Sequence, residues 1–588
     1  MSAVIGERHQ THEAHGAKRK KTLFSIQSST ALNQLRAWLL LAFFLIAYIL
    51  PLGARDLLVP DETRYAEIPR EMIATGDWVV PHFNGVRYFE KPVLGYWVHA
   101  GSLLLFGQNR FAVRLPSALA VGLSALLLSI LVRRTCGKDD GQQVGILAFL
   151  TALVFLSCFE VFGVGNIALL DSLFALWVTG TIIAFFLATE KPPDSAGEKG
   201  LLLLAGVACG LAFLTKGFLA VALPVIVLAP YLLWQGRYRD LLRMSWLPLA
   251  SAVLVALPWG LLIHLREPDF WRHFFWNEHV RRFLETDAQH KRPFWFFLAA
   301  APGLFMPWTF LTPAALIGVK ERLHDMDPQG RLLRLAICWL VLPFLFLSAS
   351  KGKLLTYVLP CFPPFALLMA LGLSHLLAKG KSRAFQGGAT VAALSFAVLL
   401  VGLIFLQFFG YQGFRLYGHL RMTVMASIGL LGLVFTCFWS ARSRNATGKV
   451  TLFGLSPLLF FFVAHFAIPD LVVEQSAPGR LLARHHNLIQ PETVLIADKE
   501  VAGAVCWEYK RDDIHVVGSP GEMDYGLQYR DASGRLLDIP ATARLIGDHP
   551  GQVVVVARAK RFRQQRAALP PPTSEDDSGP QGFVFLTY

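Results

Sequence analysis

The stretch QGGATVAALSFAVLLVGLIFLQF, residues 386–408, contains no charged side chain. As a helix it is long enough to cross a hydrocarbon core of about 30 Å. Similar apolar runs recur from Ala37 to Asp470, and 54% of the 588 residues are hydrophobic while only 16% are charged. Soluble globular chains carry roughly 25% charged residues. Most of this chain therefore does not face water, and we predict an α-helical polytopic membrane protein.

The apolar runs predict about thirteen transmembrane helices. These lie at roughly 36–53, 113–133, 144–163, 167–189, 200–215, 217–235, 246–265, 293–318, 333–350, 354–378, 386–408, 419–441 and 450–469. If the N-terminus is cytoplasmic, every second loop is cytoplasmic, and each of those loops is short and rich in Lys and Arg, as the positive-inside rule requires. The C-terminus is then predicted to lie outside.

One apolar segment tests this count. If residues 92–107 (PVLGYWVHAGSLLLFG) formed a span, every later loop would lie on the opposite side of the membrane from the one predicted above. The segment is short, however, and His99 and Ser102 interrupt it. We interpret it as a helix lying in the outer membrane interface. The basic cluster from Lys18 to Lys21 precedes the first span without a small-residue cleavage site, which indicates a cytoplasmic tail and not a signal peptide.

The sequence divides into three parts. Residues 1–35 are predicted to form a cytoplasmic tail, and residues 36–470 a membrane domain with outer loops at 54–112 and 266–292. Residues 471–588 lose the long apolar runs and show short β-rich runs between helical patterns, which predicts a small periplasmic α/β domain. Its predicted strands are 493–497, 514–517, 553–556 and 583–586, its predicted helices are 476–488 and 502–510, and 570–577 reads as a loop.

Charge and cysteine content exclude two other classes. The net charge of +14 would suggest nucleic-acid binding in a soluble protein. Here Lys and Arg are concentrated in short loops between spans, so membrane orientation explains the charge better. The seven cysteines are scattered without CxxC or metal-ligand spacing, which argues against a disulfide framework.

The first outer loop carries the densest set of ionisable groups. Asp61 and Glu62 follow Pro60 and open a predicted helix at 63–75. Acidic residues in the first turn stabilise a helix, so this pair also has a purely structural interpretation. Arg64, Glu90 and Lys91 lie nearby in the sequence. Cations beside carboxylates, at the depth of a lipid headgroup, are what a lipid-linked sugar phosphate would need.

Other candidates lie at the outer ends of the spans. Lys216 stands between two spans with no other charge from Leu201 to Gly236, and an ionisable residue so placed is a functional candidate. Asp171 at the mouth of the fourth span, and Lys351 and Lys353 in SASKGKLLTY, qualify for the same reason. His264 ends the seventh span. A lone histidine there is usually structural, but with Glu90 it could bind a divalent metal ion.

These motifs resemble those of a known family. PDETRYAEIPREM (60–72), GDWVVPH (76–82) and RYFEKP (87–92) are similar to the first periplasmic loop of bacterial lipid A aminoarabinose transferases, which are related to protein O-mannosyltransferases. The resemblance continues at LTKGFLA (214–220), REPDFW (266–271), DAQH (287–290), SKGKLLTY (350–357), RDDI (511–514) and YGLQY (525–529). It spans nearly the whole chain, and REPDFW with SKGKL is its most specific part.

The resemblance implies a glycosyltransferase of the bacterial inner membrane with its site facing the periplasm. The implied donor is undecaprenyl-phosphate aminoarabinose, the implied acceptor is a phosphate of lipid A, and the implied outcome is resistance to polymyxin and other cationic peptides. It implies Asp61 and Asp171, with the neighbouring Glu62, as catalytic acids, and Glu90 with His264 as a metal pair without implying that a metal is required. The implied phosphate-binding residues are Arg64, Lys91, Lys351 and Tyr357, and Lys216 and Lys353 are candidates for the same role because of their positions beside the spans.

Two other functions remain open at this point. One is another transferase that uses a polyprenyl-phosphate sugar, such as a protein O-mannosyltransferase relative. The other is transport, but transporters place ionisable groups near the midplane, often on paired repeats. This chain concentrates them at one face and shows no internal repeat, which favours the enzyme.

Overall fold

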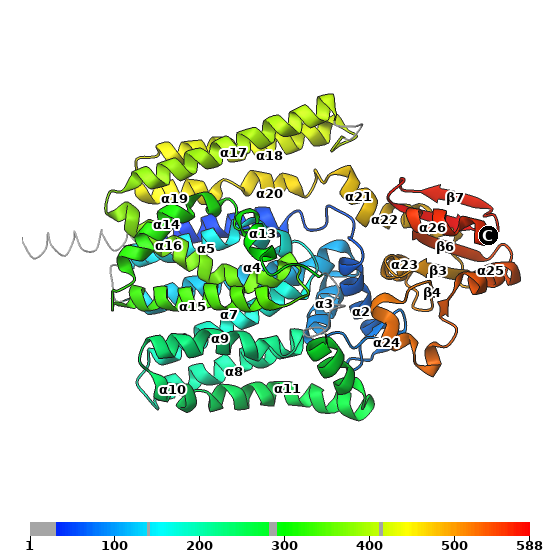
Figure 1. Ribbon diagram of the computed structural model, residues 1–588, viewed down its shortest axis with the longest axis horizontal. Coiled ribbons are helices and arrows are strands. Elements are labelled where there is room, and N and C mark those ends of the chain that lie inside the picture. Colours follow the sequence, from blue (N-terminus) through cyan, green and yellow to red (C-terminus); the bar gives the residue numbers. More distant parts are fainter. Residues whose placement is uncertain (1–30, 138–140, 282–290, 411–414) are drawn as a thin grey trace, which may run out of the picture.

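The computed structural model describes residues 31–137, 141–281, 291–410 and 415–588. Figure 1 shows a body of long helices at one end and a smaller domain containing a β-sheet at the other, with α2 and α3 between them. The first 30 residues of the predicted cytoplasmic tail, and the DAQH motif at 287–290, lie outside the described residues.

Within the described ranges, ten helices are long and apolar enough to cross a membrane, or up to twelve if each of two bent helix pairs is one span. The protein is therefore a polytopic membrane protein. The ten are Ala31–Ile49, α4 (Arg110–Cys136), α7 (Leu170–Thr189), α8 (Ala196–Lys216), Tyr238–Arg266 with α10 (Tyr238–Arg243) and α11 (Trp246–Arg266), α15 (Pro328–Ala349), Leu355–Ala378 with η4 (Leu355–Cys361) and α16 (Phe362–Ala378), α17 (Ser382–Phe409), α18 (Leu420–Arg442), and Ala446–Ala464 with α19 (Ala446–Leu455) and α20 (Leu458–Ala464).

Three predicted spans account for the difference from the predicted count. The bent pairs are α5 (Gly141–Leu156) with α6 (Phe159–Gly165), at 67°, and α13 (Phe296–Leu304) with η3 (Trp308–Leu311) and α14 (Thr312–Arg322), at 95°. The third, α9 (Leu219–Trp234), is a shorter apolar helix. Each predicted span thus coincides with a helical segment, but two of these segments are bent and one is short.

Hydrogen bonds connect the two bent regions to each other. The backbone N–H of Phe159 donates to the carbonyl of Met306 at 2.9 Å, and the indole N–H of Trp308 donates to Ser157 Oγ at 2.9 Å. Backbone groups freed by a helix break cannot turn to lipid for a partner, so they must be satisfied within the protein. The paired breaks satisfy this requirement in the middle of the helical body.

The first outer loop folds into a compact layer against the spans. It contains α2 (Asp61–Thr75), a hairpin of β1 (His82–Phe83) and β2 (Val86–Arg87), and α3 (Leu94–Phe106). The segment predicted to lie in the interface is α3, which packs against α2 and α4. Its C-terminal end exposes Leu104, Leu105 and Phe106, and Leu105 is 80% exposed.

The C-terminal part contains a six-stranded mixed sheet in the order β5-β4-β3-β6-β8-β7. Strands β3, β4, β5 and β6 are parallel neighbours, and β8 runs antiparallel to both β6 and β7. The strands are β3 (Val494–Asp498), β4 (His515–Val517), β5 (Leu536–Leu537), β6 (Val553–Arg558), β7 (Ser574–Asp577) and β8 (Phe583–Thr587). The helices are α21 (Asp470–Ser476), α22 (Gly479–Arg484), α23 (Ala502–Tyr509), α24 (Asp524–Leu527), α25 (Ile539–Asp548) and α26 (Ala559–Gln565). Short turns η5 (His486–Leu488), η6 (Gly521–Met523), η7 (Arg530–Ala532) and η8 (Arg566–Ala568) connect them, and η2 (Arg272–Arg281) follows α11.

The two faces of this sheet have different partners. Alternate residues such as Leu495, Val554 and Phe585 belong to an apolar core shared with α23 and with α2 of the first loop. The residues between them, such as Ile496 and Val555, pack against α25 and α26. Because successive side chains of a strand point to opposite faces, the domain buries one face on the first loop and covers the other with its own helices.

One sequence prediction for this region is wrong. The acidic run within 570–577 is not a loop, because Ser574–Asp577 pairs with β8 as an edge strand. Charged side chains are common on edge strands, since they discourage pairing with another chain. The helix predicted at 476–488 is present in part, as α22 from Gly479 to Arg484 followed by the short turn η5, while Ser476 ends the preceding helix α21.

Candidate functional site

The acidic pair at the start of α2 divides into an exposed and a buried carboxylate. Asp61 is the first residue of α2, and the preceding Pro60 offers no side-chain hydrogen bond to the helix. The Asp61 carboxylate pairs with the guanidinium of Arg64 one turn later, and half of its side-chain surface remains exposed. The Asp61 carboxylate thus pairs with a side chain, whereas a helix-capping residue would accept from the backbone of the first turn. Asp61 is therefore accessible to a ligand at this end of the site.

Glu62, in contrast, is fully buried and saturated with donors. Arg55 donates to it at 2.6 and 3.2 Å, Arg114 at 2.7 and 2.9 Å, and the backbone N–H groups of Leu58 and Ala168 at 2.9 and 3.2 Å. Burial opposes its ionisation, but the charges of Arg114 and Arg55 outweigh burial and hold the pKa of Glu62 at about 2. These partners leave Glu62 little capacity for substrate, so we interpret it as a positioning residue where the sequence predicted a catalytic one.

Arg64 joins the first loop to the C-terminal domain. Its side chain is buried, and it donates to the hydroxyl of Tyr88 at 3.2 Å and pairs with the carboxylate of Glu522. The Tyr88 hydroxyl in turn donates to Glu522 at 2.9 Å. A phosphate that approaches Arg64 thus meets a guanidinium already held between the carboxylates of Asp61 and Glu522.

Lys216 and Asp171 form a largely buried ion pair at the outer ends of α8 and α7. Lys216 Nζ lies 2.7 Å from Asp171 Oδ1, and the two side chains are 13% and 12% exposed. The ammonium also lies 4.7 Å from the centre of the Tyr357 ring, a favourable cation–π distance. Asp61 is close enough to act electrostatically on Lys216. Side chains from α2, α7, α8 and η4 therefore meet here.

Tyr65 links these groups into one site. Burial raises the pKa of its hydroxyl, and Arg64, Asp61, Asp171 and Glu90 all act electrostatically on that hydroxyl. Its ring stacks near Tyr96, with the centroids 6.2 Å apart. The carboxylates predicted from the first loop and from the fourth span are thus close together in space.

Glu90 and Lys91 follow the hairpin of the first loop. Lys91 Nζ donates to the backbone carbonyl of Glu90 at 2.7 Å and lies 3.9 Å from its carboxylate. Glu90 is buried. Both residues stay candidates for binding the substrate, at the edge of the cluster around Tyr65.

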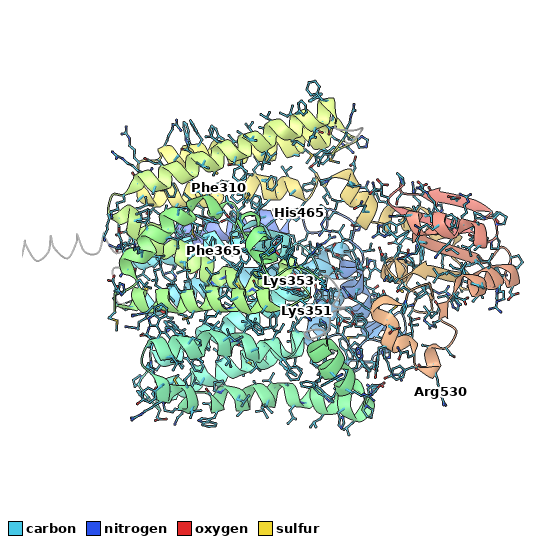
Figure 2. The ribbon with its side chains drawn as sticks, viewed as in Figure 1. Phe310, Lys351, Lys353, Phe365, His465 and Arg530 are labelled. Carbon is cyan, nitrogen blue, oxygen red and sulfur yellow. The ribbon has the colours of Figure 1, made fainter. Side chains whose placement is uncertain are left out.

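The two lysines of the SKGKL stretch are arranged differently from each other. Figure 2 shows Lys351 and Lys353 close together, between the helical body and the C-terminal domain. Lys353 is buried and donates to the carbonyls of Ser350 and of Arg292, the latter at 3.2 Å, and burial lowers the pKa of its ammonium. Lys353 therefore ties two segments together, while Lys351, which is half-buried, is the better phosphate-binding candidate of the two.

One residue of the predicted metal pair, His264, has largely apolar surroundings. It lines a cavity of about 520 Å³ with Phe213, Val253, Leu257 and Trp271. In the part of the chain that the structure describes, no three His, Cys, Asp or Glu side chains gather as a possible metal site. Divalent ions prefer several oxygen or imidazole ligands, and a metal ion at Glu90 and His264 stays a prediction.

The REPDFW motif has a structural role that its sequence did not reveal. Arg266 pairs with Asp77 at 2.8 Å, and Glu267 accepts from Arg87 at 2.8 Å. Asp269 accepts from the hydroxyl of Tyr525 at 2.6 Å, and also from that of Tyr529. The motif therefore fastens the outer end of α11 to the first loop and to the YGLQY stretch of the C-terminal domain.

Several residues of this site were not predicted from the sequence. Arg55, Arg114 and Glu522 all contact predicted site residues, but Arg114 lies 52 residues from Glu62 and Tyr88 lies 434 residues from Glu522. No local pattern signals such pairs. A buried arginine within an apolar helix was the one available signal, and it applied to Arg114.

Comparison with known proteins covers nearly the whole chain. The family model for dolichyl-phosphate-mannose-protein mannosyltransferases matches residues 33–274, and the model for the C-terminal domain of the arabinosyl transferase ArnT matches residues 473–586. A protein of Aeromonas hydrophila named undecaprenyl phosphate-alpha-4-amino-4-deoxy-L-arabinose arabinosyl transferase is 40% identical over 567 residues, which cover 94% of this chain and 99% of the relative. Its namesake in Aeromonas salmonicida is 41% identical, with 86% of this chain and 91% of the relative covered.

The fold has a solved counterpart. The crystal structure of ArnT from Cupriavidus metallidurans bound to undecaprenyl phosphate superimposes with a TM-score of 0.78 at 23% identity, covering 94% of this chain and 97% of that chain. The apo structure of the same protein gives a TM-score of 0.77 at 22% identity. This similarity extends over both the helical body and the C-terminal domain.

Proposed function

This chain belongs to the family of undecaprenyl phosphate-α-4-amino-4-deoxy-L-arabinose arabinosyl transferases, and we propose that it transfers 4-amino-4-deoxy-L-arabinose from undecaprenyl phosphate to a phosphate of lipid A. The enzyme is a pentosyltransferase of the membrane. In the cell its product is a less negative lipid A, which gives resistance to polymyxin and other cationic antimicrobial peptides.

One observation carries this proposal furthest. Two ion pairs, Lys216 with Asp171 and Arg64 with Asp61, lie near each other with the aromatic rings of Tyr65 and Tyr357 beside them. A lipid-linked sugar phosphate presents a negative group next to a polyhydroxylated ring. Paired charges at the outer ends of spans suit such a ligand, because they are already oriented, and the pair of Lys216 with Asp171 is also largely buried.

The reaction exchanges one glycosidic bond for another. An oxygen of the acceptor phosphate attacks the anomeric carbon, the bond between that carbon and the donor phosphate oxygen breaks, and undecaprenyl phosphate leaves with the bonding electron pair. The leaving group is a phosphate monoester and the acceptor phosphate is largely ionised near neutral pH. No proton has to be removed for the attack, and we expect in-line displacement with inversion.

The roles of the charged side chains follow from this chemistry. Lys216, Lys91 and Lys351 stabilise the negative charge that develops on the leaving phosphate. Asp61 and Asp171 orient the sugar, including its ammonium group, and stabilise positive charge at the anomeric carbon. A general base is needed when a hydroxyl attacks, and the phosphate acceptor makes that role unnecessary for Asp61.

The orientation of the chain in the membrane is part of the proposal. We propose that the N-terminus lies in the cytoplasm of the bacterial cell, because short loops rich in Lys and Arg favour the cytoplasmic side. Under this orientation the site around Lys216 and the sheet domain face the periplasm from the inner membrane. Residues 471–588 are then the periplasmic domain.

The alternative is a transferase for another polyprenyl-phosphate sugar. Its support is the mannosyltransferase family model over residues 33–274. The C-terminal match to the arabinosyl transferase at 473–586, which the mannosyltransferase match does not reach, favours aminoarabinose. The deciding experiment is mass spectrometry of lipid A from cells with and without this gene, in which the proposed activity adds a pentosamine increment.

A further inference from the structure

A basic cleft opens on the C-terminal domain, and no residue of the site around Lys216 lines it. Its volume is about 870 Å³, and its lining includes Glu500, Arg558, Lys560, Arg561, Arg563 and Gln581. The lining also takes in the end of α21, which continues from the last span. The cleft therefore opens next to the point where the chain leaves the helical body, as the position of α21 and α26 in Figure 1 illustrates.

The topology of the sheet explains why a cleft forms here. Strands β3 and β6 are parallel neighbours. From β3 the chain continues through α23 to β4 on one side, and from β6 it continues through α26 to β7 and β8 on the other. The two helices cover opposite faces of the sheet. In open α/β sheets, ligands bind in the crevice at the carboxyl ends of strands where the order reverses in this way.

The carboxyl ends of both strands point into the cleft. Asp498 ends β3 and Arg558 ends β6, and the backbone N–H of Arg558 donates to Asp498 at 2.7 Å. The turn before β8 reaches the same edge, because Phe583 pairs with Arg558. Asp498 is fully buried and also accepts from the N–H groups of Glu500 and Val501, at 3.0 and 3.2 Å. It therefore holds the loops together and is not open to a ligand.

The cations of the cleft are incompletely neutralised. Arg558 is engaged, with Glu500 at 2.6 Å and the Phe583 ring at 4.5 Å. Arg561 Nη1 lies 3.5 Å from the Asp498 carboxylate and Nη2 lies 3.5 Å from that of Glu500, and the buried Nη1 makes no hydrogen bond within the described residues. Lys560 and Arg563 are exposed. Four cations thus share two carboxylates, and the cleft carries an excess of positive charge.

We propose that this cleft binds a phosphate monoester. Charge-assisted hydrogen bonds from Lys and Arg bind phosphate strongly. The exposed Lys560 and Arg563 line the cleft and are three residues apart on α26, hence on one face of the helix, and Arg561 adds its charge beside them. The ligand is either a soluble phosphate ester or the headgroup of a membrane lipid, and the phosphate recognised is the same. This site is separate from the transfer site, and its existence does not depend on which sugar is transferred.

Binding of two matched probes to the purified full-length protein tests the proposal. Glycerol 3-phosphate and dihexanoyl phosphatidic acid carry the same phosphate monoester, one without and one with acyl chains. Isothermal titration in detergent compares wild type, the double variant Lys560→Gln with Arg563→Gln, and Arg561→Gln. The control is Arg544→Gln, which removes an exposed cation of α25, outside the cleft.

We expect the cleft variants to bind at least about tenfold more weakly than wild type and the control, because charge-assisted hydrogen bonds to phosphate are lost. Similar affinity for the two probes would identify a soluble phosphate ester as the ligand, and binding of phosphatidic acid alone would identify a lipid headgroup. Cleft variants that bind both probes as wild type does would overturn the proposal. So would an equal loss in Arg544→Gln, since binding would then reflect overall charge. Lipid A modification, measured in parallel, reports on the transfer site separately.

Discussion

The ammonium of Lys216 lies 2.7 Å from the carboxylate of Asp171, although 45 residues separate them in the sequence. Asp171 lies in the first turn of α7 and Lys216 ends α8, and these helices pack closely along their length. Their connection lies at the opposite end, so the start of one and the end of the other meet at a single face of the helical body. The pair is oriented by the fold before any substrate arrives.

Removing the charge of Lys216 should therefore lower transfer strongly for each molecule of folded protein. We predict that Lys216→Met lowers transfer by about 10²- to 10³-fold, the loss expected when one preorganised electrostatic partner is removed from a shielded site. The measurement is the fraction of lipid A that gains pentosamine, normalised to the protein in membranes. The matched control is Lys320→Met, an exposed lysine at the other end of the spans. Equal activity in both variants would exclude Lys216 from the site.

Glu62 should behave differently from Asp61, although they are neighbours. We predict that Glu62→Gln lowers stability by roughly 3–5 kcal/mol, because it leaves two guanidiniums buried beside a neutral amide. The measurement is the thermal unfolding midpoint in detergent, with the yield from membranes. A stable Glu62→Gln protein that has lost transfer would contradict the positioning role and restore the catalytic one.

The same residue predicts a pH dependence. The pKa of Glu62 is lowered from 4.5 to about 2, chiefly by Arg114 and Arg55 against the opposing effect of burial. A carboxylate with a depressed pKa contributes stability that is complete above its unfolded pKa and is lost as the pH falls through the folded value. Wild type should therefore lose stability more steeply than Glu62→Gln between pH 4.5 and about 2. Parallel curves for the two proteins would show that the ion pairs contribute nothing.

The C-terminal domain should influence transfer through Glu522. Its carboxylate contacts both Arg64 and Tyr88, so Glu522→Ala frees the guanidinium that Asp61 also holds. We predict a lower rate at saturating donor with little change in unfolding temperature. The control is Glu492→Ala, an exposed glutamate of the same domain. If the two variants have the same rate, the domain does not act on the site through this contact.

Chelation tests whether a divalent ion takes part. Because His264 lines an apolar cavity, we expect transfer to survive treatment with a chelator and the substitution His264→Ala. Loss of activity in both, with recovery on addition of a divalent ion, would establish the Glu90–His264 pair that the sequence suggested.

The sequence predicted what is local and missed what is distant. Apolar runs located the ten helices of the described ranges that are long enough to cross a membrane, because the length of a run and its lack of charge are sufficient to identify a membrane helix. The bends at Ser157 and Met306 could not be predicted, because each is stabilised by hydrogen bonds to the other, which lies far away in the sequence. The edge strand Ser574–Asp577 escaped because an acidic run resembles a loop until its partner is known.

The candidate site shows the same division. Asp171 and Lys216 could be identified because each is an ionisable residue at the end of an apolar span, where charge is costly, and Asp61 and Arg64 because the first outer loop concentrates charged residues. The sequence could not predict that Glu62 is buried in ion pairs while Asp61 is exposed, because only the fold brings Arg114 to Glu62. The contribution of Glu522 was equally hidden, since it depends on how the C-terminal domain packs on α2.

Asp61→Asn is the variant that tests the central claim most directly. The substitution preserves size and a hydrogen-bond acceptor for Arg64, so a merely structural Asp61 predicts a loss of at most about 1 kcal/mol in stability. A catalytic carboxylate predicts a fall in rate of about 10²- to 10³-fold, because positive charge at the anomeric carbon loses its partner. The measurement is mass spectrometry of lipid A from cells that lack the native gene and express Asp61→Asn at wild-type level. We predict that the pentosamine increment is absent or nearly so. Normal modification at normal protein level would mean that Asp61 only begins a helix and that the active site lies elsewhere.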